Sequence, residues 1–320
     1  MRMITSTVLK LLMSAAISAA ACTAMANTPV RVLVGFSPGG TTDIIARLVA
    51  EGMSRQMDND VIVENRPGAS GNIAAAQVAE AAGDGHTMLF APSSHATNAT
   101  LYNTRFDTEK DFAAVGLVAS TPYVLVVHPS LPVHTTADLI AYLKKHPGEV
   151  AYASASPGTA QHLAGEMFKR LAGVNMLHVP YKGSAAAFPD LAAGRTPVMF
   201  DNIAVVLPHI KSGAVRAIAV TSTSRSPLLP DVPTISESGI PNFQMSGWFA
   251  LLVPRSTPEK AISKLNRALN ATISDPKFRN KLQELGAEVL TTSPSESDTF
   301  IHDEIVKWRG VINDAGISLK

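Results

Sequence analysis

The chain has 320 residues, of which 46% are hydrophobic and 17% charged, and its formal net charge at pH 7 is +1. This near-neutral balance argues against nucleic acid and anionic membrane surfaces as partners. The hydrophobic content is ample for two domain cores, and a chain of this length normally divides into two domains.

The N-terminus has the features of an export signal. Two basic residues precede an apolar stretch over residues 11–21, and two alanines flank Met25 in the small-x-small pattern of a signal-peptidase site. Cleavage after Ala26 would remove a signal peptide of residues 1–26. A mature chain with 25 basic and 26 acidic residues would remain, without cysteine and therefore without disulfides or thiolate metal ligands.

A second interpretation keeps Cys22 as a lipidated first residue, because the residues before it loosely resemble a lipoprotein box. In both cases the protein leaves the cytoplasm, and no later run approaches the roughly 18–20 apolar residues of a transmembrane helix. We expect a periplasmic protein.

From residue 30 onward, apolar periodicity predicts alternating strands and helices, which is typical of βαβ units on parallel sheets. In a first series the expected strands are 30–34, 61–63 and 87–90, and the expected helices are 43–53 and 72–82. A second series has expected strands 123–127, 150–153, 177–179, 197–200 and 215–220, with helices 136–145, 160–171, 185–193 and 204–211.

The last third of the chain has a different pattern, with one expected strand at 248–254 and expected helices at 258–274, 276–285 and 295–315. It has too few strands for a third sheet, so we expect it to complete the first lobe. The prediction is an α/β protein whose first lobe comprises residues 27–124 and 248–320 and whose second lobe comprises 125–247. Two hinge crossovers would join two similar sheets, and ligands bind in such interlobe clefts.

Three loops combine a strand end, a Pro-Gly pair and the start of a helix. Glycine lets backbone approach a ligand, Ser and Thr can cap the helix, and its first turn presents unpaired N–H groups to an anion. The candidate ligand-binding residues are Phe36, Ser37, Gly39, Gly40, Thr41 and Asp43 in the first loop, Gly68, Ala69 and Ser70 in the second, and Ser154, Ser156 and Thr159 in the third.

Polar residues also follow two other expected strands. Ser94 and His95 come after strand 87–90, while Phe200, Asp201 and Asn202 end strand 197–200. Parallel strands bring such ends to one edge, so these residues join the candidate ligand-binding set. The nine histidines have no metal-binding spacing, and no Walker or Rossmann motif occurs, so we expect neither a metal nor a cofactor.

The first loop also matches G-x-S-x-G over residues 35–39, the nucleophile elbow of serine hydrolases, with Ser37 as the serine. Pro38 cannot donate the oxyanion-hole N–H expected after the nucleophile, and the motif follows the first mature strand. An exported hydrolase that uses Ser37 stays as the alternative from another class of protein. The spacing of Asp43 and Arg47 predicts an i,i+4 ion pair.

Several segments together resemble the Bug family, the periplasmic receptors of tripartite tricarboxylate transporters. They are Phe36-Ser37-Pro38-Gly39-Gly40-Thr41-Thr42-Asp43, Val63-Glu64-Asn65-Arg66-Pro67-Gly68-Ala69-Ser70-Gly71, His162-Leu163-Ala164-Gly165-Glu166 and His178-Val179-Pro180-Tyr181-Lys182-Gly183. The resemblance covers nearly the whole mature chain. It implies a type II periplasmic-binding-protein fold that closes like a Venus flytrap on a carboxylate.

The function expected from this resemblance is capture of a small organic carboxylate by a monomeric, non-enzymatic receptor that delivers it to a two-subunit membrane permease. A module that presents its ligand to a membrane sensor is a further alternative. The identity of the carboxylate stays open at this point, because amide cradles recognise the carboxylate and do not encode the rest of the molecule.

Overall fold

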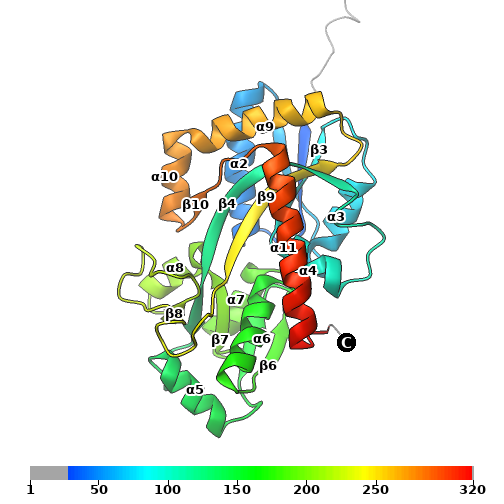
Figure 1. Ribbon diagram of the computed structural model, residues 1–320. Helices are drawn as coiled ribbons and strands as arrows, with labels where there is room; N and C mark the ends of the chain where they lie inside the picture. The colour runs from blue at the N-terminus through cyan, green and yellow to red at the C-terminus, as the bar shows by residue number, and fades with distance from the viewer. Residues whose placement is uncertain (1–27, 319–320) are drawn as a thin grey trace, which may run out of the picture.

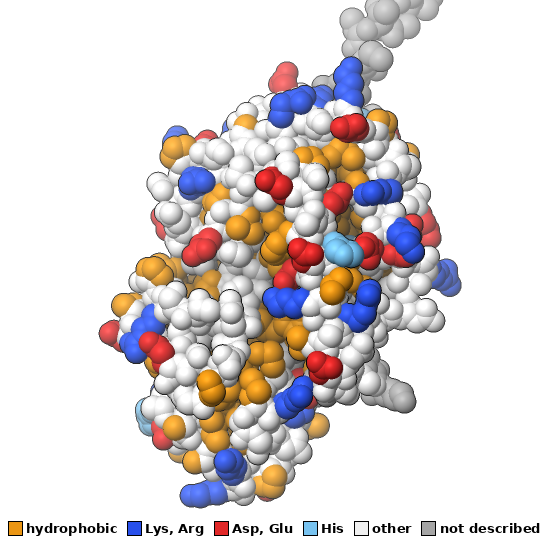
Figure 2. Space-filling view, in the orientation of Figure 1, with side chains coloured by type: hydrophobic (Ala, Val, Ile, Leu, Met, Phe, Trp, Pro, Cys, Tyr) orange, Lys and Arg blue, Asp and Glu red, His pale blue; other side chains and the backbone are white. Residues whose placement is uncertain are grey.

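The protein has two lobes, one above the other in Figure 1, in a computed structural model that describes residues 28–318. The predicted signal peptide and Cys22 lie outside the described residues. Among the described helices, none is long and apolar enough to cross a membrane. Figure 2 shows basic and acidic side chains interspersed over the face that carries the last helix.

The first lobe is built on three parallel strands in the order β2-β1-β3, extended by the antiparallel strand β9. The strands are β1 (Val30–Val34), β2 (Val61–Asn65), β3 (Thr87–Pro92), β9 (Ser246–Pro254) and the short β10 (Glu288–Val289). The helices are α2 (Thr41–Met57), the 3₁₀ turn η1 (Ala69–Gly71), α3 (Asn72–Ala79), α4 (Ser94–Leu101), α9 (Glu259–Ser274), α10 (Pro276–Glu284) and α11 (Pro294–Ala315). The C-terminal third thus returns to the first lobe's sheet.

The second lobe repeats the pattern on a smaller scale. Its strands are β5 (Ala151–Ser154), β6 (Leu177–Pro180), β7 (Val198–Asn202) and β8 (Arg216–Val220), and its helices are α5 (Thr136–Lys145), α6 (Ala160–Ala172), α7 (Ser184–Ala192) and α8 (Ile203–Lys211). Strands β6, β5 and β7 are parallel neighbours. In both lobes the helices therefore begin at the carboxyl ends of parallel strands, which is where the lobes face each other.

One long strand, β4 (Phe112–Val127), joins the lobes. Its residues 112–122 pair antiparallel with β9, and residues 123–127 pair antiparallel with β7 and β8. The expected parallel βαβ strands are present in both lobes, and in addition β4 and β9 run antiparallel and β4 connects the strands into one ten-stranded sheet. The lobe boundaries 124/125 and 247/248 stay a prediction.

The predicted elements differ from the structure mainly where polar or small residues are buried. Helix α4 was not expected, because its sequence is rich in Ser, Thr and Asn, yet its first five residues are all buried. The first half of β4 was also missed, because residues 112–122 have no polar alternation to indicate a strand. Leu171, an apolar residue at the end of α6, is 49% exposed.

The imidazoles of His162, which is buried, and His178, which is half-buried, hold the third loop, residues 154–159. The Gly158 N–H donates to Nδ1 of His162 at 3.1 Å, and Oγ of Ser154 lies 2.7 Å from Nε2 of His178. The two rings stack with centroids 4.0 Å apart. Burial lowers the pKa of His162 to about 4 and that of His178 to about 3, so both rings are neutral at pH 7.

His162→Ala should destabilise the protein, because the buried Gly158 N–H then loses its acceptor, at a cost of about 1–3 kcal/mol. His162→Asn offers an oxygen near the position of Nδ1 and should recover most of that loss. Urea unfolding of the two variants at pH 7.5 measures the difference. Equal destabilisation by both substitutions would contradict this role of the imidazole.

Candidate functional site

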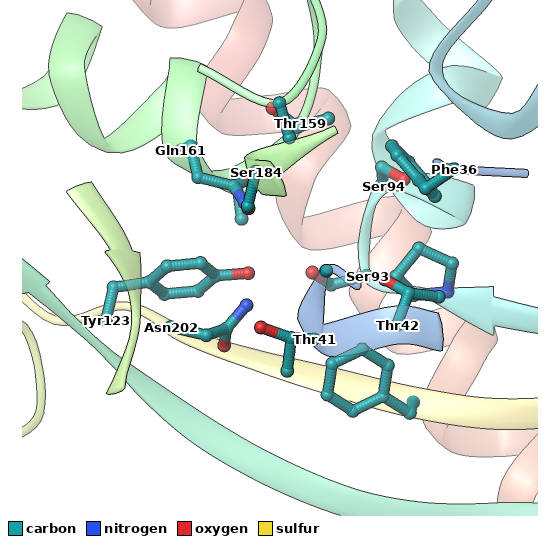
Figure 3. A pocket seen from close by; sticks show the side chains of 15 residues that line it. Phe36, Thr41, Thr42, Ser93, Ser94, Tyr123, Thr159, Gln161, Ser184 and Asn202 are labelled. Atoms are coloured by element: carbon teal, nitrogen blue, oxygen red, sulfur yellow. The ribbon is translucent and has the colours of Figure 1, made fainter. Parts of the chain in front are cut away.

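A small cavity of about 30 Å³ lies between the two lobes, and Figure 3 shows its lining. We call it the head compartment. Its fifteen lining residues come from both lobes and from the strand that joins them. They are Phe36, Gly40, Thr41, Thr42, Pro92, Ser93, Ser94, Tyr123, Ala155, Thr159, Ala160, Gln161, Ser184, Asn202 and Phe249.

Five helices begin at this compartment, namely α2 and α4 from the first lobe and α6, α7 and α8 from the second. None of the five has a side-chain hydrogen bond at its N-cap residue, which is Gly40, Ser93, Thr159, Gly183 and Asn202 respectively. The first N–H groups of a helix have no partner within the helix, and its N-terminus carries a partial positive charge. The compartment is therefore surrounded by main-chain donors.

Of the other helices, α3 and α9 also lack a side-chain cap at their N-cap residues Gly71 and Pro258, whereas three helices have one. Thr135, Asp275 and Ser293 cap α5, α10 and α11 through side-chain hydrogen bonds. The expected capping by Thr41 or Thr42 and by Thr159 is not observed: Gly40 precedes α2, and Oγ1 of Thr159 donates to the Ser156 carbonyl at 2.7 Å. Helix starts without caps are thus found at the interlobe space.

The lining contains Ser, Thr, Tyr, Asn and Gln but no Lys, Arg, His, Asp or Glu. Three of its buried polar atoms have no hydrogen-bond partner among the described residues: Oγ1 of Thr41, Oγ of Ser94 and Oδ1 of Asn202. Buried polar atoms in proteins are normally satisfied. This arrangement suits a polar ligand that accepts hydrogen bonds from main-chain amides and hydroxyls.

Tyr123 enters the compartment from the joining strand β4. Figure 3 shows its hydroxyl pointing toward the centre, near Asn202 and Ser93. Burial raises the pKa of this phenol, and the hydrogen bonds of Ser93 and Asn202 act in the opposite sense. The hydroxyl stays protonated at pH 7 and is available as a neutral hydrogen-bonding group.

Hydrogen bonds cross between the lobes beside the compartment. Ser37 donates to the Lys182 carbonyl through both its Oγ, at 2.7 Å, and its N–H, at 3.2 Å. Thr97 donates to the Gly158 carbonyl at 2.6 Å, and the Tyr102 hydroxyl donates to the Pro157 carbonyl at 2.8 Å. The structure is therefore a closed arrangement of the two lobes.

Asp43 shapes the first loop from behind. Its carboxylate accepts from the Gly39 N–H at 3.0 Å, from Arg47 and from Asn65, and the predicted Asp43–Arg47 ion pair is confirmed at 2.9 Å. Burial acts to raise the pKa of Asp43, but the hydrogen bonds of Arg47, Gly39 and Asn65 outweigh it and lower the pKa. The carboxylate is thus a structural anion that fixes the loop.

The structure brings several candidate residues together at the head compartment and places the others nearby or elsewhere. Phe36, Gly40, Thr41, Ser94, Thr159 and Asn202 line it. Gly68, Ala69, Ser70 and Ser156 line a neighbouring hollow, while Ser37, Gly39 and Asp43 make the loop and interlobe contacts described above.

Four candidates lie away from the compartment wall. Phe200 is fully buried in the second lobe's core, where its ring packs against Phe168 and Phe243. Ser154 is also fully buried and bonds to the Ser156 carbonyl and His178. His95 lies beneath the compartment, where burial lowers its pKa to about 4. Asp201 is the fourth, and it accepts hydrogen bonds from the lining residues Ser184 and Gln161.

Nine lining residues are not among the candidates predicted from the sequence: Thr42, Pro92, Ser93, Tyr123, Ala155, Ala160, Gln161, Ser184 and Phe249. Ser93 directly precedes the candidate Ser94, and Ser184 follows Gly183 at the start of α7. Both residues therefore lie at a helix start, as do the candidates in the three Pro-Gly loops. Tyr123, from the joining strand, carries no local signal. Its place depends on long-range pairing of β4.

Asp201 supports three parts of the lining at once. Its Oδ1 accepts from Oγ of Ser184 at 2.9 Å, from Nε2 of Gln161 at 3.2 Å and from the Asn202 N–H at 2.8 Å. The side chain is fully buried, and burial raises its pKa to about 6 despite these hydrogen bonds. One carboxylate thus ties together the starts of α6, α7 and α8.

The raised pKa predicts a pH-dependent stability. A carboxyl group whose pKa is higher in the folded than in the unfolded state stabilises the fold fully below about pH 3.8, and this contribution is lost as pH rises through about 6. Between about pH 7.5 and pH 4, the unfolding free energy of the wild type should therefore rise relative to Asp201→Asn by up to about 3 kcal/mol.

Urea unfolding of both proteins at the two pH values measures this change. Asp231→Asn, at an exposed carboxylate of the same lobe, is the matched control. The buried and half-buried histidines affect the unfolding free energy in the opposite sense as pH changes. The difference between wild type and variant at each pH cancels this contribution. A wild-type to Asp201→Asn difference that stays constant with pH would contradict the assignment.

Comparisons with known proteins fit this geometry. Residues 45–317 match the family model described as the tripartite tricarboxylate transporter family receptor. The chain is similar to Protein BugT of Bordetella pertussis, with 37% identity over 295 residues that cover 91% of this chain and 90% of that protein. The resemblance to Bug proteins is confirmed.

Two similar solved structures contain carboxylates. R. palustris Rpa4515 with adipate has 38% identity and a TM-score of 0.89, covering 92% of this chain and 99% of that one. MatC (Rpa3494) from Rhodopseudomonas palustris with bound malate has 32% identity and a TM-score of 0.83, covering 89% and 98%. The expected two-lobe fold is confirmed, and the chain belongs to the tripartite tricarboxylate transporter receptor family.

Proposed function

We propose that this protein is an exported, periplasmic receptor that captures a small organic carboxylate in the head compartment and delivers it to a two-subunit membrane permease. The observation that carries the proposal is the meeting of five uncapped helix starts around a cavity without charged side chains. Binding of adipate and malate by similar proteins supports it. A monomer suffices, since one chain supplies the whole lining.

Neutral donors suit a receptor that must release its ligand. A hydrogen bond to a charged group contributes about 1.5–3 kcal/mol, and a helix N-terminus adds about 0.3–1 kcal/mol. A micromolar complex needs only about 8 kcal/mol net. Several amides and hydroxyls around one carboxylate can provide this free energy without an arginine or lysine.

Carboxylates should raise the melting temperature of the mature protein, residues 27–320. A ligand at 100 times its Kd adds about 2.7 kcal/mol to the free energy of unfolding, enough for a shift of a few degrees. A thermal-shift screen of mono-, di- and tricarboxylates, with the corresponding amides as uncharged controls, measures this. Protein unfolded and refolded before the screen should be used, so that a ligand retained from the cells does not mask the shift. Equal shifts with acids and amides, or none with any acid, would contradict the proposal.

Ser37 distinguishes the receptor from the hydrolase alternative. Its hydroxyl donates to the Lys182 carbonyl, and no histidine contacts it among the described residues. Ser37→Ala removes this interlobe bond and should weaken carboxylate binding by about 2- to 12-fold, the equivalent of one hydrogen bond. Calorimetric titration measures the effect.

Ser212→Ala is a matched control, since Ser212 makes only a local bond to the His209 carbonyl at the end of α8. It should bind like the wild type. Ester hydrolysis by the wild type that disappears in Ser37→Ala would favour the hydrolase.

A further inference from the structure

The interlobe space continues beyond the head compartment. A second hollow of about 340 Å³ lies beside it and shares two lining residues with it, Phe36 and Ala155. Small-molecule sites typically have volumes of about 300–1,000 Å³. We call the second hollow the tail compartment. The two are neighbouring parts of one interlobe space with Phe36 common to both.

The two compartments differ in chemistry. Hydroxyls, amides and helix starts dominate the head compartment, whereas aromatic and proline residues dominate the tail compartment. The tail compartment is lined by Phe36, Tyr102 and Tyr181, and by Pro157 and Pro180. Such a wall offers mostly carbon surface, and the exposed Lys182 is its one charged lining residue.

The tail compartment lies inside the closed arrangement of the lobes. The Tyr102 hydroxyl reaches the Pro157 carbonyl from the first lobe, and Oγ of Ser37 reaches the Lys182 carbonyl. All four residues lie in or next to its lining. The lobes therefore touch around this hollow without filling it, and an apolar group placed there would be removed from water.

We propose that the ligand occupies both compartments, with its carboxylate at the helix starts of the head compartment and an apolar alkyl or aryl body in the tail compartment beside Phe36. This inference rests on the proposed function. It narrows the ligand class from carboxylates in general to carboxylic acids with an apolar tail.

Calorimetric titration of the wild-type mature protein with straight-chain monocarboxylates from propionate to octanoate, and with benzoate and succinate, tests the proposal. Once the alkyl chain of the ligand extends beyond the head compartment, affinity should rise by about fourfold per methylene buried and then level off. Affinity that is independent of chain length, with succinate bound as well as octanoate, would overturn the two-compartment proposal while leaving the carboxylate receptor intact. Binding of none of these acids would overturn both.

A substitution at Ser156 tests where the apolar tail of the ligand binds. Ser156 lines the tail compartment but not the head compartment, so Ser156→Leu should fill the former. We expect this variant to lose the gain in affinity with the length of the ligand's alkyl chain that the wild type shows. Ser212→Leu, at an exposed position, is the control and should keep the gain.

Persistence of the chain-length gain in Ser156→Leu would overturn the placement of the tail. Loss of propionate binding would show that the substitution disturbs the head compartment as well. The chain-length series of the wild type then decides the proposal.

Discussion

The starts of five helices meet where the two lobes face each other, and their main-chain N–H groups need acceptors. At α5, α10 and α11, side chains of Thr, Asp and Ser satisfy this need. At the interlobe compartment they do not, and the surrounding hydroxyls include several without partners. The fold thereby concentrates main-chain N–H groups that need acceptors in a single place. The preference for an anion follows from the arrangement of backbone, not from a cationic side chain.

The strand β4 joins the two lobes and also contributes a side chain to the compartment between them. Its first half belongs to the first lobe's pairing and its second half to the second lobe's, and Tyr123 stands at the change of partners. The same residue places its hydroxyl in the compartment. Groups from both lobes can contact one ligand only when the lobes are close, so a bound carboxylate favours the closed arrangement by acting as their common acceptor.

Local sequence predicted much of the fold and part of the site, for identifiable reasons. Helix α5 was predicted with its observed ends, because its apolar period and flanking threonines are local signals. Gly40, Thr159 and Asn202 were predicted because parallel strands bring their ends to one edge. Asp201 and Phe200 were misplaced, since the side of a strand that faces a cavity depends on pairing. The lining residue Gln161 follows no turn motif, and its orientation depends on the buried Asp201.

The absence of charged side chains from the head compartment lining also affects how such a receptor can evolve. A main-chain N–H survives every substitution except one to proline. Thr41 and Ala160 occupy the first positions of α2 and α6, where proline is sterically tolerated. A proline there would preserve the helix while deleting a donor. Side chains elsewhere in the interlobe space can therefore diversify freely, so new ligand preferences can arise while the means of holding a carboxylate is inherited unchanged.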